Sequence, residues 1–120
     1  MSKKTLIIGA SVNPERYAYK AAEKLIAHQH EIYMIGNKPG ELFDRKIVTE
    51  QTAYTDVDTV TLYVSAKNQT GYYDYIIGLH PRRVLFNPGT ENPDFAQRLE
   101  QAGIATEEAC TLVLLATNAY

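Results

Sequence analysis

Short apolar runs alternate with stripes of helical spacing along the chain. The first run, residues 5–8, is continuous and apolar, which is typical of a strand buried on both faces. An amphipathic helix is predicted next, because apolar residues recur there at helical spacing: Ala18, Ala21, Ala22, Leu25 and Ile26. The Asn13-Pro14 pair predicts the start of this helix, since asparagine caps free N–H groups and proline suits the first helical position.

The same alternation continues to the end of the sequence. Further strands are predicted at residues 31–35, 46–49, 59–64, 83–86 and 104–106. Further helices are predicted at residues 72–79 and 94–102, and Pro39-Gly40 indicates a loop over residues 37–44. Residues 109–116 are apolar throughout, which leaves helix and strand open and favours a helix. Alternating strands and helices form parallel sheets with right-handed crossovers. We therefore expect an α/β fold, a Rossmann-like doubly wound parallel sheet of five to six strands flanked by helices, in one domain of residues 1–120.

Composition and charge exclude several classes of protein. Hydrophobic residues make up 45% and charged residues 22% of the 120 residues, which are values of a globular domain. The net charge of −2 argues against a nucleic-acid binder, and no apolar run is long enough for a membrane span. The only cysteine, Cys110, cannot form an internal disulfide. We expect a cytoplasmic protein that binds neither nucleic acid nor membrane.

The loops that follow the predicted strands are the candidate ligand site. In doubly wound sheets the ligand lies beyond the carboxyl ends of the strands, where the strand order reverses. These loops are residues 9–13, 36–45, 65–69 and 87–92. In the first of them, Gly9 allows close backbone approach, and Ser11 and Arg16 add a hydroxyl and a guanidinium group. Free N–H groups at the following helix start favour an anion, so this loop is predicted to bind phosphate.

The dinucleotide fingerprint is incomplete in this loop. Ser11 and Pro14 stand where the second and third glycines of the pattern would fall. The second predicted strand is followed by Lys38 and by no carboxylate, which disfavours NAD and favours a ligand with an additional phosphate. The distribution of charge along the chain also favours a phosphorylated ligand at the first loops, because the first part of the chain is the more basic. Residues 1–46 hold eight basic and five acidic side chains, and residues 47–120 hold four basic and nine acidic side chains.

The loop after the fifth predicted strand has two Asn-Pro pairs around a glycine, which predicts a defined turn. Asn92 is its predicted helix cap, and its position makes the turn a wall of the ligand cleft. Glu91 would be stabilised by the helix dipole, but no partner acid or base is evident for catalysis. Paired carboxylates, a Ser–His–Asp order and metal-ligand spacing are all lacking, so binding is expected rather than a reaction.

Four segments in the same order resemble the small bacterial CoA-binding proteins. They are G-A-S-V-N-P-E-R-Y at 9–17, I-G-N-K-P-G at 35–40, F-N-P-G-T-E-N at 86–92 and A-C-T-L-V-L-L at 109–115. That family is a stand-alone Rossmann domain similar to the CoA-binding domain of the succinyl-CoA synthetase α-subunit. The chain departs from the family pattern at 43–46, where a glycine is more usual, which leaves the course of this loop open.

The resemblance implies a site for coenzyme A. The turn after the first strand and the helix start would hold the pyrophosphate, and Lys38 would face the phosphorylated adenosine. The later loops would line the cleft. The expected CoA-binding residues are Gly9, Ala10, Ser11, Asn13, Pro14, Arg16, Tyr17, Lys38, Ser65, Asn87, Pro88 and Gly89.

The expected role is that of a carrier, sensor or accessory module. A small enzyme acting on an acyl-CoA or nucleotide and an NADP-binding regulatory domain stay open as alternatives. The residues also leave open whether CoA is free or acylated, and whether the partner is a second copy or an acyl-transfer enzyme. Cys110 is either a small buried hydrophobe or a thiol that forms a mixed disulfide with CoA.

Overall fold

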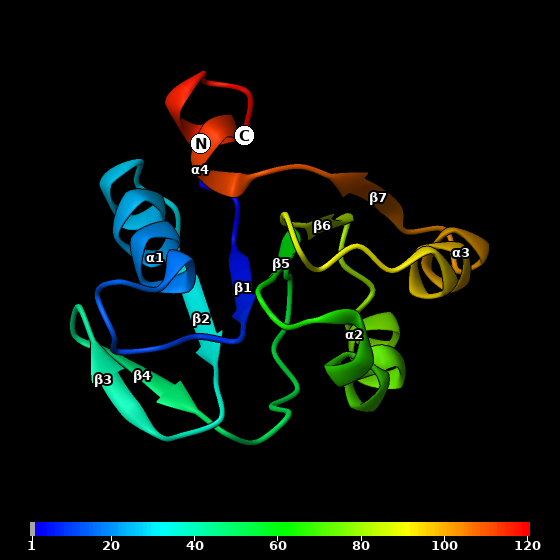
Figure 1. Cartoon of the computed structure of the whole chain (residues 1–120), viewed down its shortest axis with the longest axis horizontal. Helices are drawn as coiled ribbons and strands as arrows, with labels where there is room; N and C mark the ends of the chain where they lie inside the picture. Colours follow the sequence, from blue (N-terminus) through cyan, green and yellow to red (C-terminus); the bar gives the residue numbers. More distant parts are fainter. Residues whose placement is uncertain (1) are drawn as a thin grey trace.

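A seven-stranded sheet forms the centre of the computed structural model, which describes residues 2–120 (Figure 1). Its strand order is β3-β4-β2-β1-β5-β6-β7, and every neighbouring pair is parallel except β3 and β4. The strands are β1 (Thr5–Ile8), β2 (Ile32–Ile35), β3 (Gly40–Leu42), β4 (Arg45–Val48), β5 (Thr59–Leu62), β6 (Arg83–Phe86) and β7 (Ala105–Glu108). The predicted α/β, doubly wound fold is confirmed.

Four helices cover the two faces of this sheet. They are α1 (Tyr17–Ala27), α2 (Tyr73–Leu79), α3 (Pro93–Gln101) and α4 (Thr111–Ala116), with the short 3-10 turns η1 (Ala66–Asn68) and η2 (Thr70–Tyr72) before α2. The apolar sides of α1 and α4 pack on one face, and those of α2 and α3 pack on the other. None of the helices between residues 2 and 120 has the length and apolar character that crossing a bilayer requires.

The central strands are buried on both faces and end at the same level. Every residue of β1 and β5 is buried, as the continuous apolar pattern of β1 predicted. Ile8 lies opposite both Ile35 and Leu62, and Leu62 lies opposite Phe86. The loops that leave β1, β2, β5 and β6 therefore emerge side by side at one edge of the sheet.

Two details differ from the sequence-based expectation. Helix α1 begins at Tyr17 rather than at Pro14, because the Oδ1 atom of Asn13 accepts the N–H of Glu15 at 3.0 Å in a separate turn. The expected loop at 37–44 contains β3, which makes the sheet one strand larger than expected. Phe43 and Asp44 connect β3 to β4 as a two-residue hairpin with positive φ values of 53° and 63°.

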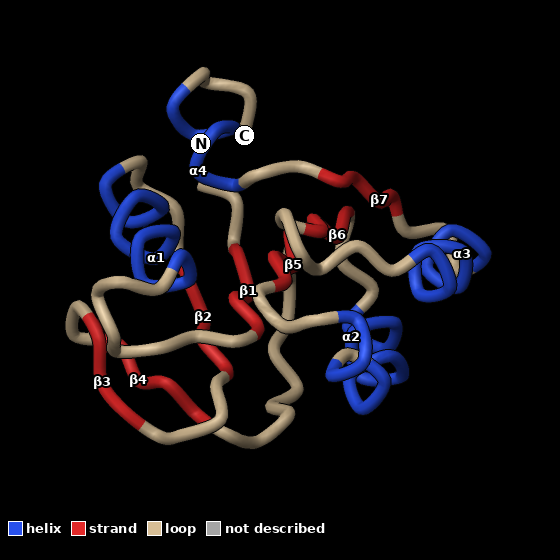
Figure 2. The backbone as a smooth tube through the Cα atoms, viewed as in Figure 1, coloured by secondary structure: helices blue, strands red, loops and turns tan. Residues whose placement is uncertain are grey.

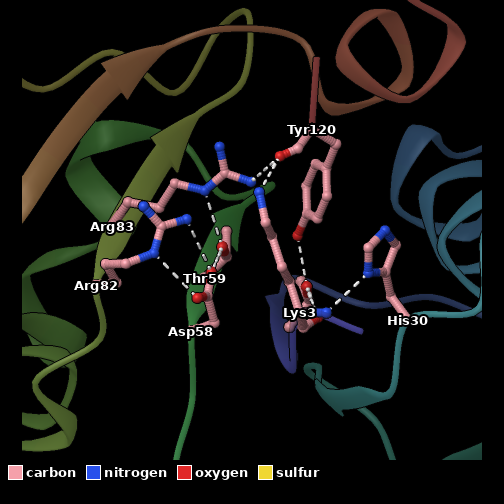
Figure 3. Close-up of polar contacts among 8 residues, drawn as sticks. Lys3, His30, Asp58, Thr59, Arg82, Arg83 and Tyr120 are labelled. Carbon is pink, nitrogen blue, oxygen red and sulfur yellow. Dashed lines mark hydrogen bonds and ion pairs between the residues drawn. The ribbon is translucent and has the colours of Figure 1, made fainter. Parts of the chain in front are cut away.

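The opposite, amino-terminal edge of the sheet is closed by Tyr120, the last residue of the sequence (Figure 3). The Tyr120 hydroxyl shares a hydrogen bond with the Thr5 hydroxyl, and its ring lies 4.5 Å from the Arg83 guanidinium carbon. Its backbone oxygen accepts hydrogen bonds from Lys3 and from Arg83. Hydrogen bonds therefore connect Tyr120 to both β1, at Thr5, and β6, at Arg83.

Protonation of His30, beside this cluster, should destabilise the fold. The backbone N–H of Lys3 donates to Nδ1 of His30 at 2.9 Å, so the ring accepts there in its neutral form. Burial lowers the pKa of His30, and neighbouring His28 and Lys3 lower it further. The stability that the neutral ring contributes is therefore present above the ordinary pKa of 6.5 and is lost as pH falls through the folded-state pKa.

Urea unfolding at about pH 7 and about pH 5 measures this contribution. The free energy of unfolding should fall more in the wild-type protein than in His30→Asn, whose amide oxygen accepts without titrating in this range. Asp58 stays ionised across this range, because hydrogen bonds from Arg82 and Thr59 hold its pKa below 3.8 although burial alone would raise it. Both proteins keep Asp58, so equal losses in the two would remove the role given to His30.

Candidate functional site at the carboxyl edge of the sheet

The strand order reverses between β1 and β5, which are neighbours in the middle of the sheet. From β1 the chain passes to β2 on one side and returns to β5 on the other. Crevices for ligands form at this point in doubly wound sheets, because the two following loops diverge to opposite faces. The four loops singled out from the sequence all begin at this edge. The second of them runs away from it through β3 to the turn at Phe43 and Asp44, because Val48, and not Arg45, pairs with Ile35 at the end of β2.

The loop after β1 is fixed across the end of β2. The N–H groups of Gly9 and Ala10 both donate to the carbonyl oxygen of Ile35 at 2.9 Å. A Cβ atom at Gly36 would lie 2.5 Å from the Ala10 carbonyl oxygen, and one at Gly40 would lie 3.1 Å from Val12. Figure 2 shows the loop passing the end of β2 toward the β3–β4 hairpin before α1 begins. Glycine at position 36 is therefore a steric requirement of this path.

Backbone N–H groups are available where the loop meets α1. The Arg16 cap residue provides no side-chain hydrogen bond to the helix. Among hydrogen bonds between residues 2 and 120, none uses the N–H groups of Ser11, Val12, Tyr17, Ala18 or Tyr19. Unpaired N–H groups at the start of an 11-residue helix carry the positive end of its dipole. This arrangement suits a phosphate group.

Two exposed cations flank these N–H groups. Arg16 lies at the start of α1, and Lys38 follows β2 in the neighbouring loop. The ion pairs within the described part of the chain join Arg82 to Asp58 and Arg98 to Asp94, so neither flanking cation is neutralised by a carboxylate.

The other predicted residues of this loop have assignable positions. The Oγ atom of Ser11 accepts the N–H of Asn13 at 3.0 Å, which shapes the turn. Pro14 is exposed. Tyr17 is 66% exposed, with the Lys20 ammonium group 5.2 Å from its ring centre, so a large aromatic face borders the N–H groups. Such a face can stack on a nucleobase.

Asn87 is buried and holds three segments together. Its Nδ2 atom donates to the Thr61 hydroxyl at 2.6 Å and to the Leu62 carbonyl at 2.9 Å, and its Oδ1 atom accepts the N–H of Thr111 at 2.9 Å. With 2% of its surface exposed, the side chain is occupied by protein contacts. The neighbouring Pro88 and Gly89 are the exposed residues of this turn.

The remaining predicted positions also lie at this edge. Ser65 is exposed after β5, and its Oγ atom accepts Nδ2 of Asn68 at 3.1 Å. Gly89 has a φ of +90°, and its N–H donates to Oε1 of Glu91 at 2.9 Å. Glu91 thus closes its own turn. The predicted cap of α3 is confirmed, because Oδ1 of Asn92 accepts the N–H of Phe95 at 3.1 Å.

Cys110 and Tyr63 lie at the same edge. Cys110 is partly exposed and precedes α4, and the next residue, Thr111, is bonded to Asn87. Burial raises the pKa of Tyr63 to about 12, and among the buried side-chain polar atoms of residues 2–120 its hydroxyl oxygen is the one without a hydrogen-bond partner. A mixed disulfide between Cys110 and CoA stays a prediction. Mass spectrometry of protein purified without reductant tests it, through an adduct of CoA mass on this residue.

Other features of the described residues do not supply a competing site. Residues 2–120 contain no group of three or more His, Cys, Asp and Glu side chains that could hold a metal ion. Two surface hollows of about 540 and 560 Å³ share Tyr54 and include none of the predicted binding residues. They are shallow depressions beside the segment between β4 and β5, away from the free N–H groups.

Comparison with known proteins places the chain in a family. Residues 3–116 match the family described as CoA binding domain. The chain belongs to this CoA-binding domain family. The predicted resemblance is thereby confirmed for almost the whole sequence. No curated protein matches the chain.

Solved structures share the fold of this CoA-binding domain over most or all of its length. A crystal structure of an uncharacterized protein is 46% identical, with a TM-score of 0.98, and the match covers 100% of this chain and 99% of that one. A hypothetical protein from Pyrococcus horikoshii OT3 is 26% identical, with a TM-score of 0.85, covering 93% and 80%. A Thermus thermophilus protein is 20% identical and shares the fold, with a TM-score of 0.89 and coverage of 99% and 91%.

The contact between Gly36 and the loop after β1 makes a direct prediction for this CoA-binding domain. Gly36→Ala should lower the free energy of unfolding by about 1–3 kcal/mol, because the added methyl group meets the backbone oxygen of Ala10. Gly78→Ala is the matched control, since a Cβ there meets nothing within 4 Å and alanine favours helix α2. Urea unfolding of both variants measures the difference. A stable Gly36→Ala protein would contradict the fixed path of the loop.

Proposed function

We propose that this chain binds coenzyme A or an acyl-CoA at the carboxyl edge of its sheet and acts as a carrier, sensor or accessory module. The observation that carries the proposal is the set of unpaired N–H groups at the start of α1, flanked by Arg16 and Lys38 without acidic partners. Membership of the CoA-binding domain family supports the choice of ligand. Backbone N–H donors at a helix start favour a diphosphate, and separate cations favour a further phosphate group.

The residues fit CoA in a definite order along the edge. The turn of Gly9, Ala10 and Ser11 and the first turn of α1 would hold the diphosphate with their N–H groups, with Arg16 beside it. Lys38, on the β2 side, would face the phosphorylated ribose. Asn13 and Pro14 would hold the turn open by setting the start of α1 back to Tyr17.

The pantetheine half would extend to the other side of β1. Ser65, Pro88 and Gly89 are exposed along that side and are uncharged, which suits neutral amide groups, and the exposed Lys67 follows in the same loop as Ser65. Asn87 would act there by holding the turn rather than by direct contact. When bound, CoA would supply the thiol that carries an acyl group, and the chain would supply its orientation.

Removal of the flanking cations tests the proposed order. Arg16→Ala should weaken binding of both CoA and dephospho-CoA, by about tenfold for one charge-assisted contact. Lys38→Ala should weaken binding of CoA by a similar factor and leave that of dephospho-CoA unchanged, because the latter lacks the phosphate that Lys38 faces. Both side chains are exposed, so stability should change by less than about 0.5 kcal/mol. Calorimetric titration measures the affinities.

Lys24→Ala is the matched control, since this exposed lysine lies in the last turn of α1, away from the free N–H groups. Titration of the wild-type protein with NADP and NAD completes the set. Equal wild-type affinity for CoA and dephospho-CoA would remove the role of Lys38. Tighter binding of NADP than of CoA would replace the proposed ligand.

A further inference from the structure

Gln69 is a buried amide that joins the two loops beyond β5 and β6. Sequence pattern does not distinguish it, because a glutamine between short polar turns resembles a surface residue. It has 0% of its surface exposed, which is uncommon for glutamine. Burial of an amide is costly unless its donors and acceptor are all paired, so its partners define its role.

The Gln69 side chain reaches a carbonyl of each loop. Its Nε2 atom donates to the Val64 carbonyl at 2.9 Å and to the Thr90 carbonyl at 2.8 Å. Its Oε1 atom accepts Nδ2 of Asn92 at 3.0 Å. Asn92 also donates to the Tyr73 hydroxyl at 2.8 Å, which ties the pair to helix α2. One side chain therefore connects the end of β5, the turn after β6 and the start of α3.

The backbone alone does not hold these loops together. Beyond the sheet ladder, no backbone hydrogen bond in residues 2–120 joins residues 63–69 to residues 87–92. The Asn87 side chain connects its turn to the last two residues of β5, Thr61 and Leu62. Gln69 supplies the connection farther out, at Thr90, next to the exposed groups of Pro88 and Gly89. Residues 63–69 and residues 87–92 are the two walls of the proposed site. Loss of Gln69 would remove the side-chain connection between them at Thr90.

We propose that Gln69 is a positioning residue that sets the spacing of the two walls around the pantetheine half of CoA. This inference rests on the proposed function. The strand order places Lys38 on the β2 side of β1, and the walls held by Gln69 on the β5–β6 side. Neighbouring strands lie about 4.8 Å apart, so the two regions are separated by several strand spacings. Gln69 therefore affects one half of the ligand and leaves the nucleotide half to the loop after β1.

Comparison of CoA with its nucleotide half, adenosine 3′-phosphate 5′-diphosphate, tests this division. In Gln69→Leu, all three side-chain hydrogen bonds are lost with little change of volume. Gln69→Glu keeps the acceptor for Asn92 and loses the amide donor to the two loop carbonyls. Calorimetric titration should find CoA binding weakened about tenfold in both variants, while binding of the nucleotide half changes by less than about twofold. A purely structural role would weaken both ligands together.

Tyr73→Phe is the matched control, because it removes a hydrogen bond of the same network without touching either loop carbonyl. It should leave both affinities unchanged. If neither Gln69 variant folds, Asn92→Asp decides, since it keeps the cap of α3 and loses the donor to Gln69. Equal losses for the two ligands, or none for either, would overturn the positioning role. Failure of the wild-type protein to bind CoA would instead overturn the proposed function.

Discussion

The loop after β1 lies flat across the end of β2 because no side chain stands between their backbones. Gly36 leaves room for the Ala10 carbonyl, and a single oxygen of Ile35 receives the N–H groups of Gly9 and Ala10. This path carries the chain sideways before α1 begins, so the first turn of the helix opens onto the edge of the sheet. The geometry of the proposed anion site therefore follows from close packing of backbone, before any charged side chain contributes.

The two sides of the edge have different physical characters. On the β2 side, Arg16 and Lys38 are exposed and can follow a phosphate at small cost in packing. On the β5–β6 side, Asn87 and Gln69 are buried neutral amides with defined partners, which fix the backbone around them. Charge attraction tolerates mobile side chains, whereas shape selection requires fixed walls. A ligand with an anionic half and a neutral, flexible half matches this division.

Local pattern predicted the parts of the fold that depend on near neighbours. Buried strands appear as apolar runs, and the cap at Asn92 needs only residues three positions apart. The hairpin after Gly40 was missed because Phe43 and Asp44 adopt positive φ without the usual glycine or asparagine. Gln69 was missed because its burial depends on Thr90 and Asn92, which are more than twenty positions away. Such contacts exist only once the sheet has formed.

The fold pairs its polar groups unevenly between the two edges of the sheet. At the amino edge, Arg83 and Lys3 both donate to the Tyr120 backbone oxygen, and Arg82 is neutralised by Asp58. At the carboxyl edge, Arg16 and the first N–H groups of α1 find no partner in the described chain. Unpaired donors beside an unneutralised cation are stabilised most by an anion. The same sheet thus pairs its polar groups with its own chain at one edge, and at the other it leaves donors for the anionic ligand that we propose.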